Sequence, residues 1–262
     1  MSYESQYSSA VVDSMESAYG EGFLSPGGAE EVGDMLSGLA LGGLTVLDLG
    51  CGIGGASVLL ARSFGAARVV GIDVEADSIA RATDAAKALK LDDRVSFQHV
   101  EPGPLPLPDD DFDLVFTKDV VCHLPDKVPL LAEVCRVLRP GGLLILGDWM
   151  KGDDSAGTEA FEAWVAQHRA AGLKFSFEPE AVYCDALDAA GFIDVTLREH
   201  SEWSAEKARR EIAHNRGPGR DALVRKMGEA AVDVRIHLTE TRLHAIESGG
   251  LRHCHVRAHK PG

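Results

Sequence analysis

Short apolar runs alternate with amphipathic segments through the first half of the chain. Runs of strand length, each bounded by turn residues, predict strands at residues 44–49, 67–72, 94–100, 112–117 and 143–146. Apolar side chains at helical spacing predict helices at residues 57–64, 75–91 and 128–138. Because strands and helices alternate, the pattern predicts an α/β fold with a doubly wound, mostly parallel sheet.

The segments on either side of this core have a different pattern. Residues 1–43 contain two short helical stretches, 11–19 and 29–41, joined by a glycine-rich loop, and we expect this segment to form a lid over the carboxyl ends of the strands. Residues 44–150 form the predicted core, and residues 151–262 form a substrate-side part. Within that last part the pattern predicts two inserted helices, a sixth strand at 192–198, a long helix at 219–248 and a final, antiparallel strand at 251–259.

One stripe of the predicted long helix is apolar. Its members are Leu223, Met227, Ala230, Val234 and Leu238. Such a stripe is more often buried in a core than open as a binding groove, so we expect it to pack inside the protein.

Composition narrows the range of functions. The chain has 262 residues, 45% of them hydrophobic, and a formal net charge of −15, which disfavours a nucleic-acid partner. Five scattered cysteines without a CxxC pair indicate a reduced, cytoplasmic protein, and no apolar run is long enough for a membrane span. Residues 201–262 hold 12 Lys and Arg against 8 Asp and Glu, which marks either a solvated face or a site for an anionic group.

A glycine-rich turn follows the first predicted strand. Gly50, Gly52 and Gly55 match the G-x-G-x-x-G pattern, in which glycines let a ligand approach the backbone at a helix N-terminus. Asp48, two residues earlier, would repel a pyrophosphate but would suit a cationic ligand. Asp73, at the end of the second strand, can accept the ribose hydroxyls of an adenosine, as in either NAD or S-adenosylmethionine (SAM).

Three stretches together resemble the class I SAM-dependent methyltransferases: LDLGCGIGG at 47–55, LPLPDDDFDLVF at 105–116 and LAEVCRVLRPGGLLIL at 131–146. The resemblance implies a seven-stranded Rossmann-like sheet, SAM as cofactor and S-adenosylhomocysteine as product. The residues that it places at the cofactor are Asp48, Gly50, Gly52, Asp73, Val74, Glu101 and Lys118.

A narrower resemblance covers nearly the whole chain. Residues 6–7, 19–28, 118–124 and 147–149 are similar to those of phosphoethanolamine N-methyltransferases. This similarity implies that Tyr7 and His123 close over the substrate amine as the catalytic pair and that Asp119 lies against the substrate ammonium. The further residues that it places around the acceptor are Gln6, Leu24, Ser25, Trp149, Trp164, His168 and Arg242.

The phosphate-binding part of that family's pattern is altered here. Trp164 and Ala170 stand where the family has tyrosines, His168 where it has an arginine, and Arg242 matches its lysine loosely. We therefore expect a small-molecule amine as acceptor, either phosphoethanolamine-like or, with a smaller anion, sarcosine- or dimethylglycine-like. Trp149 and Trp164 could also face a methylated ammonium through cation–π contact, or pack as core aromatics.

Other interpretations remain open at this point. The nucleophile could be oxygen, sulfur or carbon, and the protein could bind SAM without catalysis; an NAD-dependent oxidoreductase is disfavoured by Asp48 and by the methyltransferase motifs. His253 and His255 would share one face of the last strand, but because no second cluster has ligand spacing we expect no metal site. We expect a monomer or weak homodimer, with no nucleic acid or membrane as partner.

Overall fold

The computed structural model describes residues 6–152 and 158–262, so residues 1–5 of the predicted lid and 153–157 of the predicted insertion lie outside the described part. The chain divides into two compact units. The first comprises residues 1–148, 181–197 and 255–262, and the second comprises residues 149–180 and 198–254.

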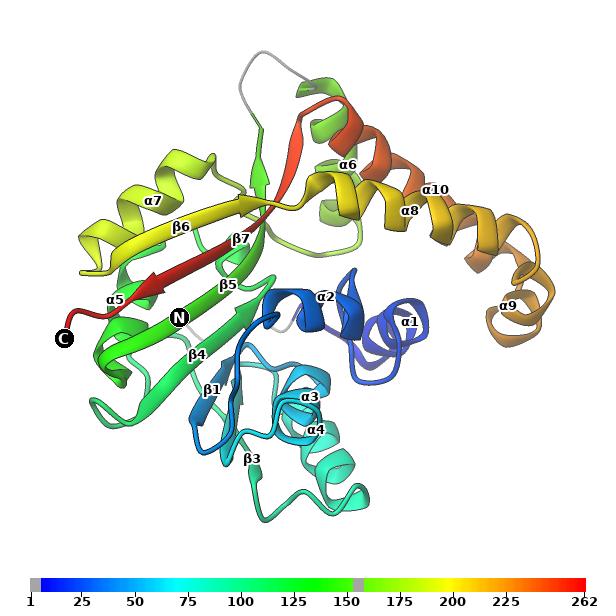
Figure 1. Ribbon diagram of the computed structural model, residues 1–262. Helices are drawn as coiled ribbons and strands as arrows, with labels where there is room; N and C mark the ends of the chain where they lie inside the picture. Colours follow the sequence, from blue (N-terminus) through cyan, green and yellow to red (C-terminus); the bar gives the residue numbers. More distant parts are fainter. Residues whose placement is uncertain (1–5, 153–157) are drawn as a thin grey trace. The chain divides into compact units, whose positions relative to one another are not determined.

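A seven-stranded sheet, in the order β3-β2-β1-β4-β5-β7-β6, is the centre of the first unit. Its strands are β1 (Thr45–Leu49), β2 (Arg68–Asp73), β3 (Val95–His99), β4 (Phe112–Lys118), β5 (Leu138–Lys151), β6 (Ile193–Glu199) and β7 (Leu251–His259). The strands from β3 to β5 pair in parallel, and Figure 1 shows β7 running opposite to β6. The predicted doubly wound, mostly parallel sheet is confirmed.

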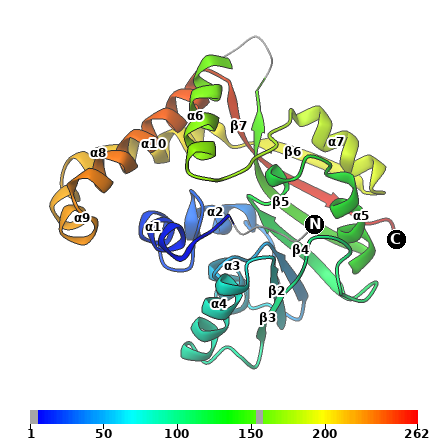
Figure 2. The same ribbon diagram turned by 180° about the vertical axis from the view of Figure 1, so that it is seen from behind.

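Helices cover both faces of this sheet. Those of the first unit are α1 (Ser9–Tyr19), α2 (Gly28–Met35), α3 (Gly55–Arg62), α4 (Ala76–Ala88), α5 (Val128–Val137) and α7 (Glu180–Ala189). Figure 1 and Figure 2 show α3 and α4 on one face and α5 and α7 on the other. Val46, Leu60, Val69 and Phe116 belong to the core between α3, α4 and the sheet, where burial of apolar side chains stabilises the unit.

The strand order reverses at the centre of the sheet. Leu49 of β1 pairs with Ile72 of β2 on one side and with Thr117 of β4 on the other. Loops that follow these strands therefore meet at one edge of the sheet, at the topological switch point where open α/β sheets bind their ligands.

The second unit is mainly helical. Its helices are α6 (Thr158–Ala170), α8 (Ser201–Arg216), α9 (Arg220–Met227) and α10 (Glu229–Glu247). Helix α10 packs against both α6 and α8, and Trp149, Phe161, Trp164 and Ile246 are in its apolar core. Within the described residues, no helix combines the length and the apolar composition that a membrane crossing requires.

The predicted continuous helix at 219–248 is wrong, and so is the burial of its apolar stripe. Gly228 has a φ of 85° and separates α9 from α10, which resets the phase of the following helix. Val234 is consequently 59% exposed and Leu238 37%, whereas Val232 and Ile236 are buried. Helix α8 was not predicted, because most of the side chains that it buries are small or polar.

Candidate active site

The turn after β1 requires glycine at several positions. Gly50 and Gly52 have φ values of 73° and 52°, and a Cβ atom on Gly50 would lie 2.2 Å from a methyl group of Val120. The Gly50 N–H donates to the Ile72 carbonyl (2.8 Å), and the Gly52 N–H donates to Asp73 Oδ2 (2.8 Å). The turn is thus held against the end of β2 and has no room for a side chain at Gly50.

The N-terminal segment lies directly on this turn. The Gly55 N–H, at the start of α3, donates to the Gly22 carbonyl (3.0 Å), and a Cβ atom on Gly55 would lie 2.4 Å from that oxygen. Leu24 also approaches the turn, since its Cδ1 atom would lie 3.1 Å from a Cβ atom on Gly52. Nearer the N-terminus of the segment, the Gln6 N–H donates to Glu75 Oε1 (3.1 Å). Residues 22 and 24 of the N-terminal segment therefore lie against the glycine turn, and a lid function of this segment stays a prediction.

A buried carboxyl group, that of Asp48, and a partly buried one, that of Asp73, flank the turn. Asp48 accepts a 2.5 Å hydrogen bond from the Ser57 hydroxyl. Burial raises the pKa of Asp48 to about 7, and the charge of Asp73 adds to the shift although Ser57 opposes it. Burial also raises the pKa of Asp73, whose oxygens accept from the N–H groups of Gly52 and Glu75. Each Asp73 oxygen keeps a further lone pair for a ligand hydroxyl.

The predicted catalytic pair is brought together. Tyr7 precedes α1 in the N-terminal segment. His123 is the last residue of the 3-10 turn Val121–His123, which follows β4. The Tyr7 hydroxyl lies 3.3 Å from His123 Nε2, and the two rings meet edge to face with their centroids 6.3 Å apart. A proton can therefore be shared between the two side chains.

Lys118 is at the centre of a buried charged cluster. Its ammonium donates to Ser25 Oγ (2.8 Å), to the Pro26 carbonyl (2.8 Å) and to Asp119 Oδ2 (2.5 Å). It also lies 3.2 Å from a carboxylate oxygen of Glu31, in α2. Burial alone would lower the pKa of Lys118, but Asp119 and Glu31 outweigh it and raise that pKa. Because these partners occupy the ammonium, a cofactor contact of Lys118 would have to come from its backbone.

Asp119 is held in an unusual conformation. Its φ is 58°, in the left-handed region, and its N–H donates to the Gly147 carbonyl (2.8 Å). While Oδ2 binds Lys118, Oδ1 is buried and has no hydrogen-bond partner among the described residues. An unpartnered carboxylate oxygen of this kind is a candidate contact for a ligand donor.

The other predicted cofactor residues also lie at this edge. Val74 follows β2, and its carbonyl oxygen lies 3.2 Å from His99 Nε2, whereas Glu101 follows β3 with an exposed side chain. Glu31 was missed from the sequence, although it is fully buried. The available signal was its spacing, since Glu31 lies one helical turn before the buried Met35 on the same face of α2.

The predicted aromatic acceptor residues lie in the second unit and pack on one another. The rings of Trp149 and Trp164 are 6.2 Å apart, and His253 stacks on Trp149 at 4.2 Å. His168 lies 4.5 Å from Trp164, whose carbonyl oxygen is 2.9 Å from His168 Nδ1. Burial lowers the pKa of His168, and the charge of Arg242 adds to this shift, so the imidazole favours its neutral form.

Arg242, in α10, is buried beside a second arginine. Glu211 Oε2 lies 3.2 Å from Arg242, and Glu211 Oε1 lies 3.3 Å from Arg235. Within the described part of the chain, Arg242 Nε is buried without a hydrogen-bond partner. Two guanidinium groups thus share the Glu211 carboxylate.

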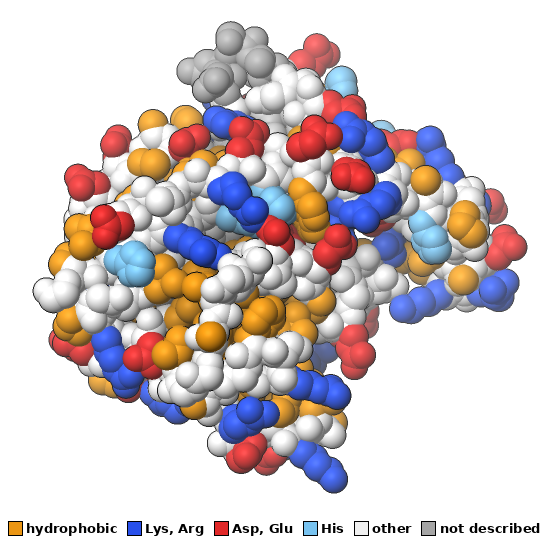
Figure 3. All heavy atoms as spheres, in the orientation of Figure 1, with side chains coloured by type: hydrophobic (Ala, Val, Ile, Leu, Met, Phe, Trp, Pro, Cys, Tyr) orange, Lys and Arg blue, Asp and Glu red, His pale blue; other side chains and the backbone are white. Residues whose placement is uncertain are grey.

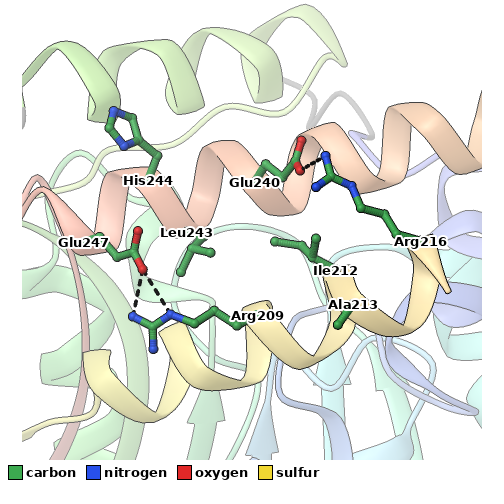
Figure 4. A pocket seen from close by; sticks show the side chains of 8 residues that line it. All are labelled: Arg209, Ile212, Ala213, Arg216, Glu240, Leu243, His244 and Glu247. Atoms are coloured by element: carbon green, nitrogen blue, oxygen red, sulfur yellow. Dashed lines mark hydrogen bonds and ion pairs between the residues drawn. The ribbon is translucent and has the colours of Figure 1, made fainter.

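A groove of about 430 Å³ runs between α8 and α10 in the same unit (Figure 4). Ile212, Ala213 and Leu243 line it, and the ion pairs Arg209–Glu247 and Arg216–Glu240 close its two ends. Figure 3 shows side chains of both charges interspersed over these helices, in keeping with such pairs. Several basic residues of 201–262 are thus paired with acids of the same segment.

Comparison with known proteins places the chain among methyltransferases. The family described as "Methyltransferase domain" matches residues 41–185. Phosphoethanolamine N-methyltransferase 1 of Arabidopsis thaliana is 29% identical over 208 residues, which cover 79% of this chain and 40% of that protein. The chain thus spans less than half the length of this relative.

Solved structures show the same fold. Phosphoethanolamine N-methyltransferase 2 of Haemonchus contortus, in complex with phosphomonomethylethanolamine and S-adenosylhomocysteine, has a TM-score of 0.88 at 24% identity, over 98% of this chain and 58% of that one. A putative sarcosine dimethylglycine methyltransferase from Galdieria sulphuraria has a TM-score of 0.74 at 18% identity, over 88% and 85% of the two chains. Because the family match covers more than half of the sequence, this protein belongs to the methyltransferase-domain family.

Proposed function

We propose that this protein transfers a methyl group from SAM to a small-molecule amine. The observation that carries the proposal is the buried Oδ1 of Asp119, which has no hydrogen-bond partner among the described residues. Its other oxygen, Oδ2, is bound by Lys118, which also pairs with Glu31. Buried charge favours compensation, and a ligand ammonium beside Asp119 would supply it.

The glycine turn fits SAM better than a dinucleotide. The buried Asp48 and the partly buried Asp73 suit a ligand that carries an ammonium, a sulfonium and ribose hydroxyls. Gly50 and Gly52 would line the cofactor, Asp73 would accept from its ribose, and Glu101 would face its adenine. When bound, SAM supplies an electrophilic methyl group.

Tyr7 and His123 would prepare the acceptor. A protonated amine has no free lone pair, so its proton must leave before the nitrogen can attack the methyl carbon. An imidazole can in general take up a proton near neutral pH, so His123 would accept it, and the Tyr7 hydroxyl, 3.3 Å from Nε2, would hold the ring in place. Asp119 would orient the amine, and the lid, with Gln6, Leu24 and Ser25, would exclude water.

The identity of the acceptor rests on the second unit. By resemblance, Trp149, Trp164, His168 and Arg242 would contact the acceptor outside its amine. Related proteins are named both as phosphoethanolamine and as sarcosine dimethylglycine methyltransferases, so both acceptor types stay in the proposal. Methylation of oxygen, sulfur or carbon, a non-catalytic role, the cytoplasmic location and the monomeric or weakly dimeric state stay predictions.

A mass-spectrometric screen tests the proposal. The protein is incubated with SAM and, separately, with phosphoethanolamine, sarcosine, dimethylglycine and hydroxyl or thiol compounds of similar size. We expect an amine to gain the mass of one methyl group for one hydrogen, and Asp119→Asn to lose that activity while it still binds SAM by calorimetry. Methylation of only the hydroxyl or thiol compounds, or none in any mixture, would contradict the proposal.

A further inference from the structure

We infer that three buried side chains, Lys127, Asp148 and Tyr183, form a clamp that positions the catalytic His123. The inference rests on the proposed role of His123 and adds residues that do not themselves touch the substrate. All three are almost inaccessible to solvent, with exposures of 2%, 0% and 0%. Each makes contacts that lead to the turn carrying His123.

The turn that carries His123 cannot hold its shape alone. It is a single 3-10 turn of three residues, closed by hydrogen bonds from the His123 N–H to the Val120 carbonyl and from the Leu124 N–H to the Val121 carbonyl (3.1 Å each). One isolated turn fixes several dihedral angles for few hydrogen bonds, so it is unstable without tertiary contacts. The position of the imidazole therefore depends on what grips this turn.

Asp148 accepts a hydrogen bond from a backbone N–H group of the turn. The backbone N–H of Cys122, next to His123, donates to Asp148 Oδ2 at 2.7 Å. Asp148 belongs to β5, in the interior of the sheet, which gives the carboxylate a rigid base. Burial raises the pKa of the Cys122 thiol, and the Asp148 charge raises it further, so the thiol remains a neutral part of this contact.

Lys127 donates hydrogen bonds to backbone carbonyl groups of the same turn. Its ammonium donates to the Leu124 carbonyl (3.0 Å) and to the Val121 carbonyl (3.3 Å). Val121 and Leu124 stand on either side of His123 in the sequence. The Asp148 carboxylate therefore binds the turn at the Cys122 N–H, and the Lys127 ammonium binds it at carbonyl groups before and after the histidine.

Tyr183 contacts both Asp148 and Lys127. Its hydroxyl donates to Asp148 Oδ2 (3.1 Å), and the Lys127 ammonium lies 4.7 Å from the centre of its ring. Tyr183 comes from α7, which lies on the same face of the sheet as α5, the helix that starts just after Lys127 (Figure 2). Burying an aspartate and a lysine is costly, and apolar side chains could fill the space. The charged arrangement is explained by the geometry that it imposes on the turn.

Turnover of clamp variants tests this role. Tyr183→Phe removes only a hydroxyl, and Lys127→Met removes the ammonium but keeps a long side chain. We expect each to lower kcat about 10- to 100-fold, as displacement of a catalytic group does, with little change in SAM affinity. The matched control is Lys260→Met, because Lys260 also donates to two backbone carbonyls of this unit, those of Arg136 and Leu138, and should keep the wild-type kcat.

A double-mutant cycle separates positioning from stability. If the clamp acts through His123, adding Tyr183→Phe to His123→Ala should leave kcat unchanged, since no imidazole remains to be positioned. A loss of the same factor in both backgrounds would overturn the inference, because it would show a general loss of folded enzyme. Asp148→Asn, which keeps a side-chain oxygen for the Cys122 N–H, should retain more activity than Asp148→Ala; equal losses would also contradict it.

The titration of His123, followed by NMR with S-adenosylhomocysteine present, needs no turnover. We expect the pKa of the imidazole in Tyr183→Phe and Lys127→Met to differ from that of the wild type, and the pKa in Lys260→Met to match it. An unchanged titration in both clamp variants would overturn the inference. Absence of methyl transfer by the wild type would instead count against the proposed function, so the two failures are distinguishable.

Discussion

The two units hold their predicted ligand-binding residues in different ways. At the sheet edge of the first unit, backbone N–H groups and short acids such as Asp73 are fixed by parallel strands, and glycines leave no room for substitution. In the second unit, the corresponding groups are long side chains on helices, such as Arg242 and Trp164. Long side chains can be exchanged without moving the backbone. Under the proposed function, the fold would constrain binding of the methyl donor, whereas the choice of acceptor would be adjustable.

Loss of the catalytic imidazole should have the largest effect. His123→Ala is expected to lower kcat about 10²- to 10⁴-fold with SAM affinity retained, because general acid–base catalysis contributes a factor of this size. Tyr7→Phe should lower kcat less, and the double variant should be no worse than His123→Ala. Steady-state kinetics and calorimetry measure these quantities. If Trp164→Ala, in the second unit, lowered kcat as much, the assignment of catalysis to residues of the first unit would be contradicted.

The second largest effect is expected from a methyl group added where the N-terminal segment contacts the glycine turn. Gly55→Ala places a Cβ atom 2.4 Å from the Gly22 carbonyl, and neither backbone can yield easily. We expect a loss of about 1–3 kcal/mol in the free energy of unfolding, as for other overpacked sites, together with weaker SAM binding. Gly33→Ala is the control, since a Cβ atom there meets nothing within 4 Å. Equal stability of the two variants in urea would show that the lid does not press on the turn.

The buried acid of the first unit should make stability depend on pH. Asp48 has a pKa of about 7, above the ordinary value of 3.8, so between these values the folded protein holds a proton that the unfolded chain has released. The free energy of unfolding should therefore fall as pH rises towards 7, by up to about 1.4 kcal/mol per pH unit from this group, and level off above it. Asp48→Asn should lack this slope. Urea unfolding of the cofactor-free protein from pH 5 to 8 measures it, and parallel curves for both proteins would contradict the assignment.

Smaller effects are expected in the second unit. Arg242→Ala should raise KM for the acceptor, and not for SAM, about 3- to 10-fold, a range typical of a partly screened charge. Glu211→Gln should lower KM for a phosphate-bearing acceptor by a similar factor, because it releases the two arginines that Glu211 now binds. Arg220→Ala is the control, since Arg220 pairs with Glu229 and Asp233. Equal changes in KM for both substrates would make Arg242 a structural residue.

Much of the first unit could be predicted from local sequence patterns. Predicted strands coincide with observed ones to within a few residues, except that β5, predicted at 143–146, extends from Leu138 to Lys151. The second unit was predicted less well. Small and polar residues line the buried side of α8, and the break at Gly228 changes which face of the following helix is apolar. Periodicity cannot detect either feature.

The sequence by itself determined the alternation of strands and helices and the place of the glycine turn, because hydrophobic period and glycine conformation are local properties. Only the tertiary structure decided which distant side chains meet. Lys118 reaches Ser25 across 93 residues and Tyr183 reaches Asp148 across 35, whereas the pair Tyr7 and His123, 116 residues apart, was expected only through the family resemblance. These contacts arise where the lid, the switch point and the helices of one face converge, and no window of neighbouring residues contains the packing that brings them together.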